Sequence, residues 1–307
     1  MIGPEDSTLS GSKPEETSRI ANARSPGISA KVKVEIASLS HQGLVRTNNE
    51  DSFLVTTMER RMRTLMTNLP SDQISQDYAE IVYGMVVADG MGGSVAGEVA
   101  SRTAIATLVD LVIGTPDWIM RLDEQRTTEV LRRADERMRK LAAALNEAAA
   151  INPQLSGMGT TLTLAASLGA DLLVAHVGDS RAYLFTKGQL VRLTKDQTMA
   201  QLLADLGVIS VDELSKHHSR HVLTSAISAT DAKVEVELHH LYLANGDQLL
   251  LCSDGLTEMV TDNYIKAVLT QNKKVDESCQ ALVDGALAGG GTDNVTVILA
   301  RYEFPKT

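Results

Sequence analysis

Runs of alternating polar and apolar residues begin near residue 31 and continue almost to the end of the 307-residue chain. The first run, Lys-Val-Lys-Val-Glu-Ile at 31–36, has the period of two that is typical of a strand with one buried face. Short turns at 168–171, 177–180 and 186–189 separate neighbouring runs and predict antiparallel hairpins. The other strand-like runs lie at 52–57, 81–88, 160–168, 172–178, 181–186, 234–241, 247–252 and 294–302.

Helical periodicity predicts four helices, at 96–113, 117–150, 262–271 and 275–288. The second is the clearest, because its apolar residues recur on one stripe with arginine and glutamate opposite. The stripe is formed by Val130, Leu131, Ala134, Met138, Leu141, Ala142 and Leu145. Asn152-Pro153 then predicts its end. The segment 58–80, with three arginines, is interpreted as an insertion, and its pattern assigns it neither strand nor helix.

The strands come in blocks, which argues against the regular strand–helix alternation of a doubly wound nucleotide-binding fold. Residues 1–30 are rich in Ser, Pro, Gly and Glu and show no periodicity, so a disordered N-terminal arm is expected. Residues 31–304 show neither an internal repeat nor a second core. We therefore predict one domain over that range.

Composition and net charge argue against several classes of function. Hydrophobic residues make up 43% of the chain and aromatic residues only 3%, so the core must be largely aliphatic. The net charge of −10 argues against nucleic-acid binding and favours cationic ligands. Cys252 and Cys279 lie too far apart for a disulfide framework or a zinc site, and buried thiols are expected. Without a long apolar run or signal peptide, we expect a cytoplasmic protein with no membrane partner.

The glycine-rich segment at 83–101, YGMVVADGMGGSVAGEVAS, is open to two interpretations. Glycines between an apolar run and a helix are typical of a dinucleotide-binding turn, and Asp110 lies twenty residues after Gly90. These glycines, however, surround the carboxylate of Asp89, which would repel a phosphate. The alternative is part of a metal site.

Acidic residues at other strand ends favour the metal interpretation. Glu50 and Asp51 precede one apolar run, Asp254 follows another, and Asp293 precedes the last. Each alone is typical turn chemistry. Together with Asp89 they predict a cluster of carboxylates, whose mutual repulsion would require bound cations. Ligands that are all oxygen atoms suit Mg²⁺ or Mn²⁺.

Eight motifs resemble those of the metal-dependent serine/threonine phosphatase family known as PP2C, in its bacterial form. They follow the family's order and cover about residues 38 to 302. The motifs are GLVRTNNEDSF, VVADGMGG, GMGTTLTLA, VAHVGDSRAYL, LTKDQT, HVLTSAI, LLCSDGLTEMV and GTDNVTVIL. The resemblance implies an α+β fold, a four-layer α-β-β-α sandwich of two antiparallel sheets flanked by helix pairs. It also implies hydrolysis of phosphoserine and phosphothreonine in proteins by metal-bound water.

By matching positions, the resemblance implies two Mn²⁺ or Mg²⁺ ions per chain. Asp89 would bridge them. Glu50 and the backbone carbonyl of Gly90 would complete one site, and Asp254 and Asp293 the other.

The same matching implies roles for three further residues. Arg46 would bind the substrate phosphate, because its planar guanidinium can contact two oxygens at once. Asp51 would orient the attacking water. Asn294 would support Asp293 without touching substrate.

Three departures from the family pattern change these expectations. Ser156 stands where bacterial members place an aspartate that helps to bind a third metal, so a third ion should be weak or absent. Met91 stands where eukaryotic relatives often carry a histidine, which leaves the proton donor unassigned. Gln197 stands where histidine is common, at the start of a flap region expected at about 196–228.

Other tempting residues have simpler interpretations. His217 and His221 have the spacing of a helical metal pair, but with no third ligand nearby we expect exposed flap histidines. Asp179 is expected to be a structural residue of a hairpin turn, with a role in shaping the site as the second interpretation.

Two rival functions remain to be weighed. A catalytically weak PP2C-like regulatory or binding module is favoured only by Ser156. A nucleotide-binding oxidoreductase would need parallel crossovers, which the pattern lacks. For an active phosphatase the expected partners are phosphorylated proteins and Ser/Thr kinases, and a monomer is expected.

Overall fold

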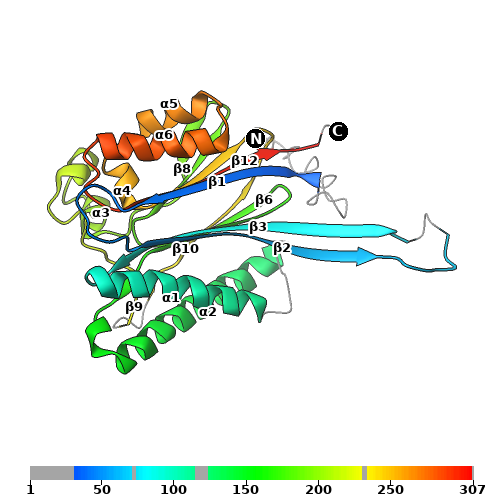
Figure 1. Ribbon diagram of the computed structural model, residues 1–307, viewed down its shortest axis with the longest axis horizontal. Helices are drawn as coiled ribbons and strands as arrows, with labels where there is room; N and C mark the ends of the chain where they lie inside the picture. The colour runs from blue at the N-terminus through cyan, green and yellow to red at the C-terminus, as the bar shows by residue number, and fades with distance from the viewer. Residues whose placement is uncertain (1–30, 71–73, 115–123, 230–233, 306–307) are drawn as a thin grey trace, which may run out of the picture.

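The computed structural model describes residues 31–70, 74–114, 124–229 and 234–305. Two antiparallel sheets face each other, and a pair of helices covers the outer face of each (Figure 1). This arrangement confirms the predicted α+β class and its four α-β-β-α layers. Among the described helices, none combines the length and apolar character needed to span a bilayer.

The first sheet has five strands in the order β1-β12-β11-β7-β8. It joins the beginning and the end of the described chain, because β1 pairs with β12 from Lys33↔Glu303 to His41↔Val295. Its strands are β1 (Lys33–His41), β12 (Val295–Glu303), β11 (Gln248–Cys252), β7 (Arg181–Thr186) and β8 (Gln189–Arg192).

The second sheet has seven strands, with β2 paired to β3 beside the order β10-β6-β5-β3-β4-β9. The predicted strand at 160–168 is divided, because β4 pairs with β9 whereas β5 pairs with β6. The strands are β2 (Asp51–Arg63), β3 (Asp77–Met91), β4 (Gly159–Thr160), β5 (Leu162–Leu168), β6 (Asp171–Val177), β9 (Ile227–Ser228) and β10 (Glu237–Tyr242).

All four predicted helices are present. Helices α1 (Ser94–Ile113) and α2 (Glu124–Ile151) cover the second sheet, and α5 (Asp262–Thr270) and α6 (Val275–Ala288) cover the first (Figure 1). Most of the predicted start of α2 lies outside the described residues. Four shorter helices connect these elements: η3 (Pro153–Leu155), α3 (Met199–Asp205), η4 (Val211–Lys216) and α4 (Asp254–Thr257).

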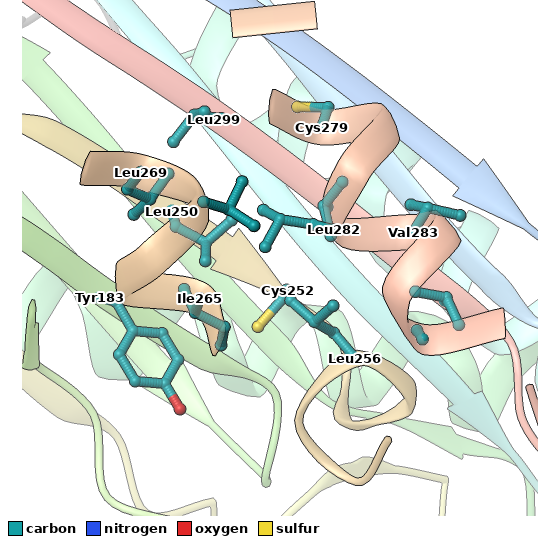
Figure 2. Packing of buried hydrophobic residues seen from close by; sticks show 14 of the residues in the cluster. Tyr183, Leu250, Cys252, Leu256, Ile265, Leu269, Cys279, Leu282, Val283 and Leu299 are labelled. Carbon is teal, nitrogen blue, oxygen red and sulfur yellow. The ribbon is translucent and has the colours of Figure 1, made fainter. Parts of the chain in front are cut away.

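The core is aliphatic, as the composition predicts. On α2, the predicted stripe residues Met138, Leu141 and Leu145 are buried against α1 and the second sheet. Figure 2 shows Leu250, Ile265 and Leu282 among the side chains gathered between β11 and the helices α5 and α6. Each fully buried side chain of this kind contributes about 1.5–3 kcal/mol to folding. Both cysteines are free and buried, as predicted.

Much of segment 58–80, to which the sequence assigned no structure, continues β2 and β3. The two strands pair without interruption from Asp51↔Asp89 to Arg63↔Asp77. Because β5 pairs with β3 only from Val82 to Val87, the outer part of this hairpin pairs with no other strand of the described chain. It projects from the body of the molecule as a two-stranded ribbon (Figure 1).

The turn at 177–180 does not close a hairpin, contrary to the prediction. Strand β6 pairs with β5 and β10, whereas β7 pairs with β11 and β8, so the chain crosses here from one sheet to the other. Gly178 has φ +109°, and a Cβ there would lie 2.6 Å from Cγ2 of Thr161. The crossing places Asp179 at the end of the sandwich where the acidic strand ends also lie.

Candidate metal centre

The first acidic strand ends meet through β2 and β3. Asp51 opens β2 directly opposite Asp89, which lies near the end of β3. The Gly90 amide donates to the carbonyl of Glu50 at 3.3 Å. The Asp89 amide donates to Oγ1 of Thr161 at 3.0 Å, and Oγ1 of Thr160 donates to the Asp89 carbonyl at 2.8 Å. Backbone bonds therefore fix the strand end and leave the Asp89 carboxylate out of the ladder.

Glycines allow this strand end to lie against helix α1. A Cβ on Gly90 would lie 2.0 Å from the carbonyl oxygen of Gly97 in α1. A Cβ on Gly97 would lie 2.0 Å from Oε2 of Glu50. The glycine-rich segment thus brings a helix, a strand end and a carboxylate into contact, which supports the metal interpretation of the sequence.

The second pair of acidic strand ends comes from the other sheet. Asp254 is the first residue of α4, immediately after β11, and Asp293 lies just before β12. Strands β11 and β12 are neighbours, and a Cβ on Gly255 would lie 1.9 Å from the carbonyl oxygen of Asn294. The two segments are therefore in backbone contact.

Asn294 joins the two sheets at this end of the sandwich. Its Oδ1 accepts from the Glu50 amide, and its Nδ2 donates to the carbonyls of Gln42 and Asn48, all at 2.8 Å. Its own amide donates to Oδ1 of Asp293 at 2.8 Å. Asn294 therefore holds Glu50 as well as Asp293, whereas the sequence predicted support of Asp293 alone.

These residues surround one cavity of about 930 Å³. Among the predicted residues, its lining includes Arg46, Glu50, Asp89, Gly90, Asp254 and Asp293. Asp51 is not among the described residues that line it: this carboxylate is buried behind, where Oδ2 accepts from Oγ of Ser253 at 2.7 Å. Ser156 is likewise outside the lining, although its neighbour Gly157 contributes to it.

Two buried carboxylate oxygens lack partners within the described part of the chain: Oδ1 of Asp51 and Oδ1 of Asp254. Burial raises the pKa of Asp89 and Asp254 well above the ordinary value, and neighbouring carboxylates raise it further. Burial also raises the pKa of Asp51 to about 6. Unsatisfied oxygens and crowded negative charge are what a bound cation would relieve, and the oxygen donors fit Mn²⁺ or Mg²⁺.

Arg46 lies at the exposed side of the cavity. Its Nη2 donates to Oδ2 of Asp293 at 2.6 Å, and the guanidinium side chain is 48% exposed. This hydrogen bond raises the pKa of Arg46 further above its ordinary value. The side chain is thus permanently charged and accessible to a ligand.

Four ionisable residues of the cavity lining were not assigned as ligands or substrate-binding residues from the sequence: Asp179, Arg220, His221 and Glu258. Asp179, expected first to be structural, is half-buried on the cavity wall, and the desolvation of its carboxylate raises its pKa to about 7. Glu258 follows Asp254 by four residues, a spacing that places two side chains on one face of a helical turn. That spacing was the available sequence signal.

His221 is exposed, as predicted, but the expectation that no further ligands lie nearby is wrong. Its Nδ1 lies 2.9 Å from Oε1 of Glu258. Ligand atoms of His221, Asp254 and Glu258 all lie within 4.8 Å of one another. His217 does not share a helix with it, because η4 ends at Lys216.

The family model described as protein phosphatase 2C matches residues 68–285. The chain belongs to this family. It is 38% identical over 274 residues to the serine/threonine protein phosphatase PstP of Mycobacterium tuberculosis, which covers 88% of this chain. The match spans 46% of that relative, so the chain corresponds to about half of its length.

Other members of the protein phosphatase 2C family match as well. The serine/threonine phosphatase stp of Listeria monocytogenes is 34% identical over 229 residues, which cover 72% of this chain and 84% of that protein. A solved structure of the catalytic domain of the phosphatase PstP in complex with two manganese ions has a TM-score of 0.69 and 35% identity. That match covers 89% of this chain and 99% of the solved one.

Proposed function

We propose that this protein hydrolyses phosphoserine and phosphothreonine in proteins with two divalent cations, Mn²⁺ or Mg²⁺. The observation that carries the proposal is the convergence of Glu50, Asp89, Asp254 and Asp293 on one cavity beside Arg46. The relative solved with two manganese ions supports the same ion count. A third ion at the Ser156 position is weak or absent, because a hydroxyl replaces the expected carboxylate.

Different residues of the chain would hold the two cations. Glu50 and the Gly90 carbonyl would hold one cation, Asp254 and Asp293 the other, and Asp89 would contact both. The bound cations would supply an activated water and stabilise charge on the phosphate oxygens.

Asp51 and Arg46 act beside the cation ligands. Because Ser253 fixes Oδ2 of Asp51, its Oδ1 remains to accept a hydrogen bond from the attacking water. The Arg46 guanidinium, which donates to Asp293, would bind two phosphate oxygens if Asp293 instead held a cation. The serine or threonine oxygen would leave on the side away from the water, and the proton that it takes up would balance the one that the attacking water loses.

The biological setting proposed here follows from that activity. Substrates are phosphorylated proteins, with Ser/Thr kinases among the possible partners, and the protein acts as a cytoplasmic monomer. Residues 31–304 form the catalytic unit, while the arm at 1–30 lies outside the described residues.

The deciding experiment uses metal-stripped protein and a phosphothreonine peptide, titrated with Mn²⁺. We expect phosphate release that depends on Mn²⁺, two ions bound per chain, and a loss of about 100-fold or more in Asp254→Asn. The matched control is Asp110→Asn, on the exposed surface of α1, which should keep full activity. Folded protein that binds Mn²⁺ but releases no phosphate would instead support the regulatory module.

A further inference from the structure

A basic segment, defined as residues 216–221, lies in the flap region. It reads Lys-His-His-Ser-Arg-His, so all but Ser219 are cationic or protonatable. The chain as a whole has a net charge of −10, whereas this segment contains two cations, Lys216 and Arg220, and no acidic residue. Charged side chains on a loop are usually solvated, so a role in substrate binding requires that the segment lie beside the cavity.

The basic segment reaches the edge of the catalytic cavity. Arg220 and His221 both line it. The residues before them form a compact turn after η4, in which the Arg220 amide donates to the His217 carbonyl at 3.1 Å. Lys216 and His218 are exposed on this turn. Cationic groups therefore extend from the cavity wall onto the surface that a bound peptide would cover.

Acidic groups near the basic segment do not neutralise it. Glu213 on η4 is engaged locally, because its Oε2 accepts from the amide and the hydroxyl of Ser210 at 2.8 Å. Lys216 makes no ion pair with any described residue. Among the described residues, Glu258 forms the ion pairs with the segment, 2.9 Å from Nδ1 of His221 and 3.8 Å from Nε of Arg220, and the Asp254 carboxylate lies within 4.8 Å of His221.

The contact with Glu258 shows that the segment can bind a carboxylate at the cavity. The basic segment can bind a further anion, because the Nη atoms of Arg220 have no hydrogen-bond partner within the described ranges. The phosphate to be cleaved is assigned to Arg46, on a different loop. The segment's remaining cationic groups are thus available for a second anion on the same substrate.

We propose that the basic segment selects phosphorylated sites that carry a second anionic group, a carboxylate or another phosphate, within a few residues of the scissile phosphate. The inference rests on the proposed phosphatase function and names its substrate class. Complementary charge beside a cavity raises the association rate and excludes partners of the opposite charge pattern.

The test compares three phosphothreonine peptides that differ only in their neighbours: alanines, glutamates, or a second phosphothreonine. At low salt, kcat/KM for the glutamate peptide should exceed that for the alanine peptide by about fivefold, the effect of one exposed charge pair. The difference should shrink when the salt rises from ~0.05 M to ~0.5 M. A preference confined to the second phosphate would identify phosphate as the anion selected.

A charge-reversal variant tests whether the basic segment causes the preference for acidic peptides. In Lys216→Glu the ratio of kcat/KM between the acidic and alanine peptides should fall toward one. The control is Lys140→Glu, on the exposed face of α2, which changes the net charge equally and should preserve the ratio. Equal turnover of all three peptides would overturn the proposal. An unchanged ratio in Lys216→Glu, or an equal loss in the control, would also overturn it.

Failure of the proposed function can be told apart from failure of this inference. If the protein hydrolyses none of the peptides, their equilibrium binding can still be measured by fluorescence anisotropy. Tighter binding of the acidic peptides, lost in Lys216→Glu, would support the basic segment as an anion-selecting surface. Indifferent binding would overturn it.

Discussion

At the scale of single residues, Arg46 and Asp293 form the contact that joins the proposed ligands to the proposed phosphate site. The guanidinium donates to a carboxylate that a cation would also engage. Arg46 would therefore contact both Asp293 and the substrate phosphate, so the shape of its guanidinium matters as well as its charge. Lysine would keep the charge but present a single ammonium group.

Arg46→Lys should lower kcat/KM for a phosphothreonine peptide by about 10- to 100-fold, because a charge-assisted bidentate contact is lost. Mn²⁺ stoichiometry should stay unchanged, since the cation ligands are intact. Arg102→Lys, which alters an arginine paired with Glu98 on the surface of α1, is the matched control. Full activity in Arg46→Lys would remove Arg46 from the phosphate site.

Gly90 shows how backbone contact at one position fixes the site. In Gly90→Ala the added methyl would lie 2.0 Å from the Gly97 carbonyl, so α1 or the strand end must shift. We expect a loss of about 3 kcal/mol or more in the free energy of unfolding, measured by urea denaturation. Gly188→Ala, with φ +74° and open space around it, should lose only about 1–2 kcal/mol. Equal losses would mean that the close contact is readily relaxed.

At the scale of elements, the ribbon formed by the outer parts of β2 and β3 stands apart from the sandwich. Met62 near its tip is 50% exposed, and in the connection that follows Arg63 the side chains of Leu65 and Met66 are 82% and 93% exposed. The proposed ligands lie at the opposite end of the same two strands, where Asp51 faces Asp89. The ribbon is therefore not needed to build the cavity.

Replacing residues 60–80 by Asn-Gly should leave the sandwich intact, because Glu59 and Ile81 face each other and a two-residue turn can join them. The free energy of unfolding should change by no more than about 1 kcal/mol, since an isolated two-stranded ribbon is marginally stable. Phosphatase activity should be retained. Loss of the folded state in urea denaturation would show that the ribbon stabilises the sheet.

At the scale of the whole molecule, the buried carboxylates make stability depend on pH and on metal. Burial raises the pKa of Asp51 to about 6 and that of Asp179 to about 7. The folded protein then binds more protons than the unfolded chain between these values and about 4, the usual range for aspartate. Its stability must fall as the pH rises through this window.

We expect the metal-free protein to lose stability from about pH 4 to pH 7, with Asp51 alone contributing on the order of 3 kcal/mol. Saturating Mn²⁺ should flatten the dependence, because a cation favours the charged carboxylates. Urea midpoints across this range, with and without metal, measure both effects. Asp51→Asn is expected to reduce the slope, and a slope of opposite sign would contradict the burial argument.

Features set by neighbouring residues could be predicted from the sequence, whereas features set by contacts between distant residues could not. Period-two and helical patterns predicted the strands and helices, because the burial of one face gives apolar residues a regular spacing along the local sequence. They assigned no structure to 58–80, where the strands have no fully buried face and leave no clear alternation. They failed at 177–180, where a hairpin and a crossing between sheets use the same short, glycine-containing turn.

The carboxylate positions were indicated by the sequence alone, since Glu50, Asp89, Asp254 and Asp293 each stand at a strand end. The motif order then implied the family, and the family match bears this out. That the four surround one cavity was decided only by the tertiary structure, because strands from both sheets must be brought to the same end of the sandwich. The same holds for Asp179, His221 and Glu258: charges far apart in the chain meet only after the sheets have packed.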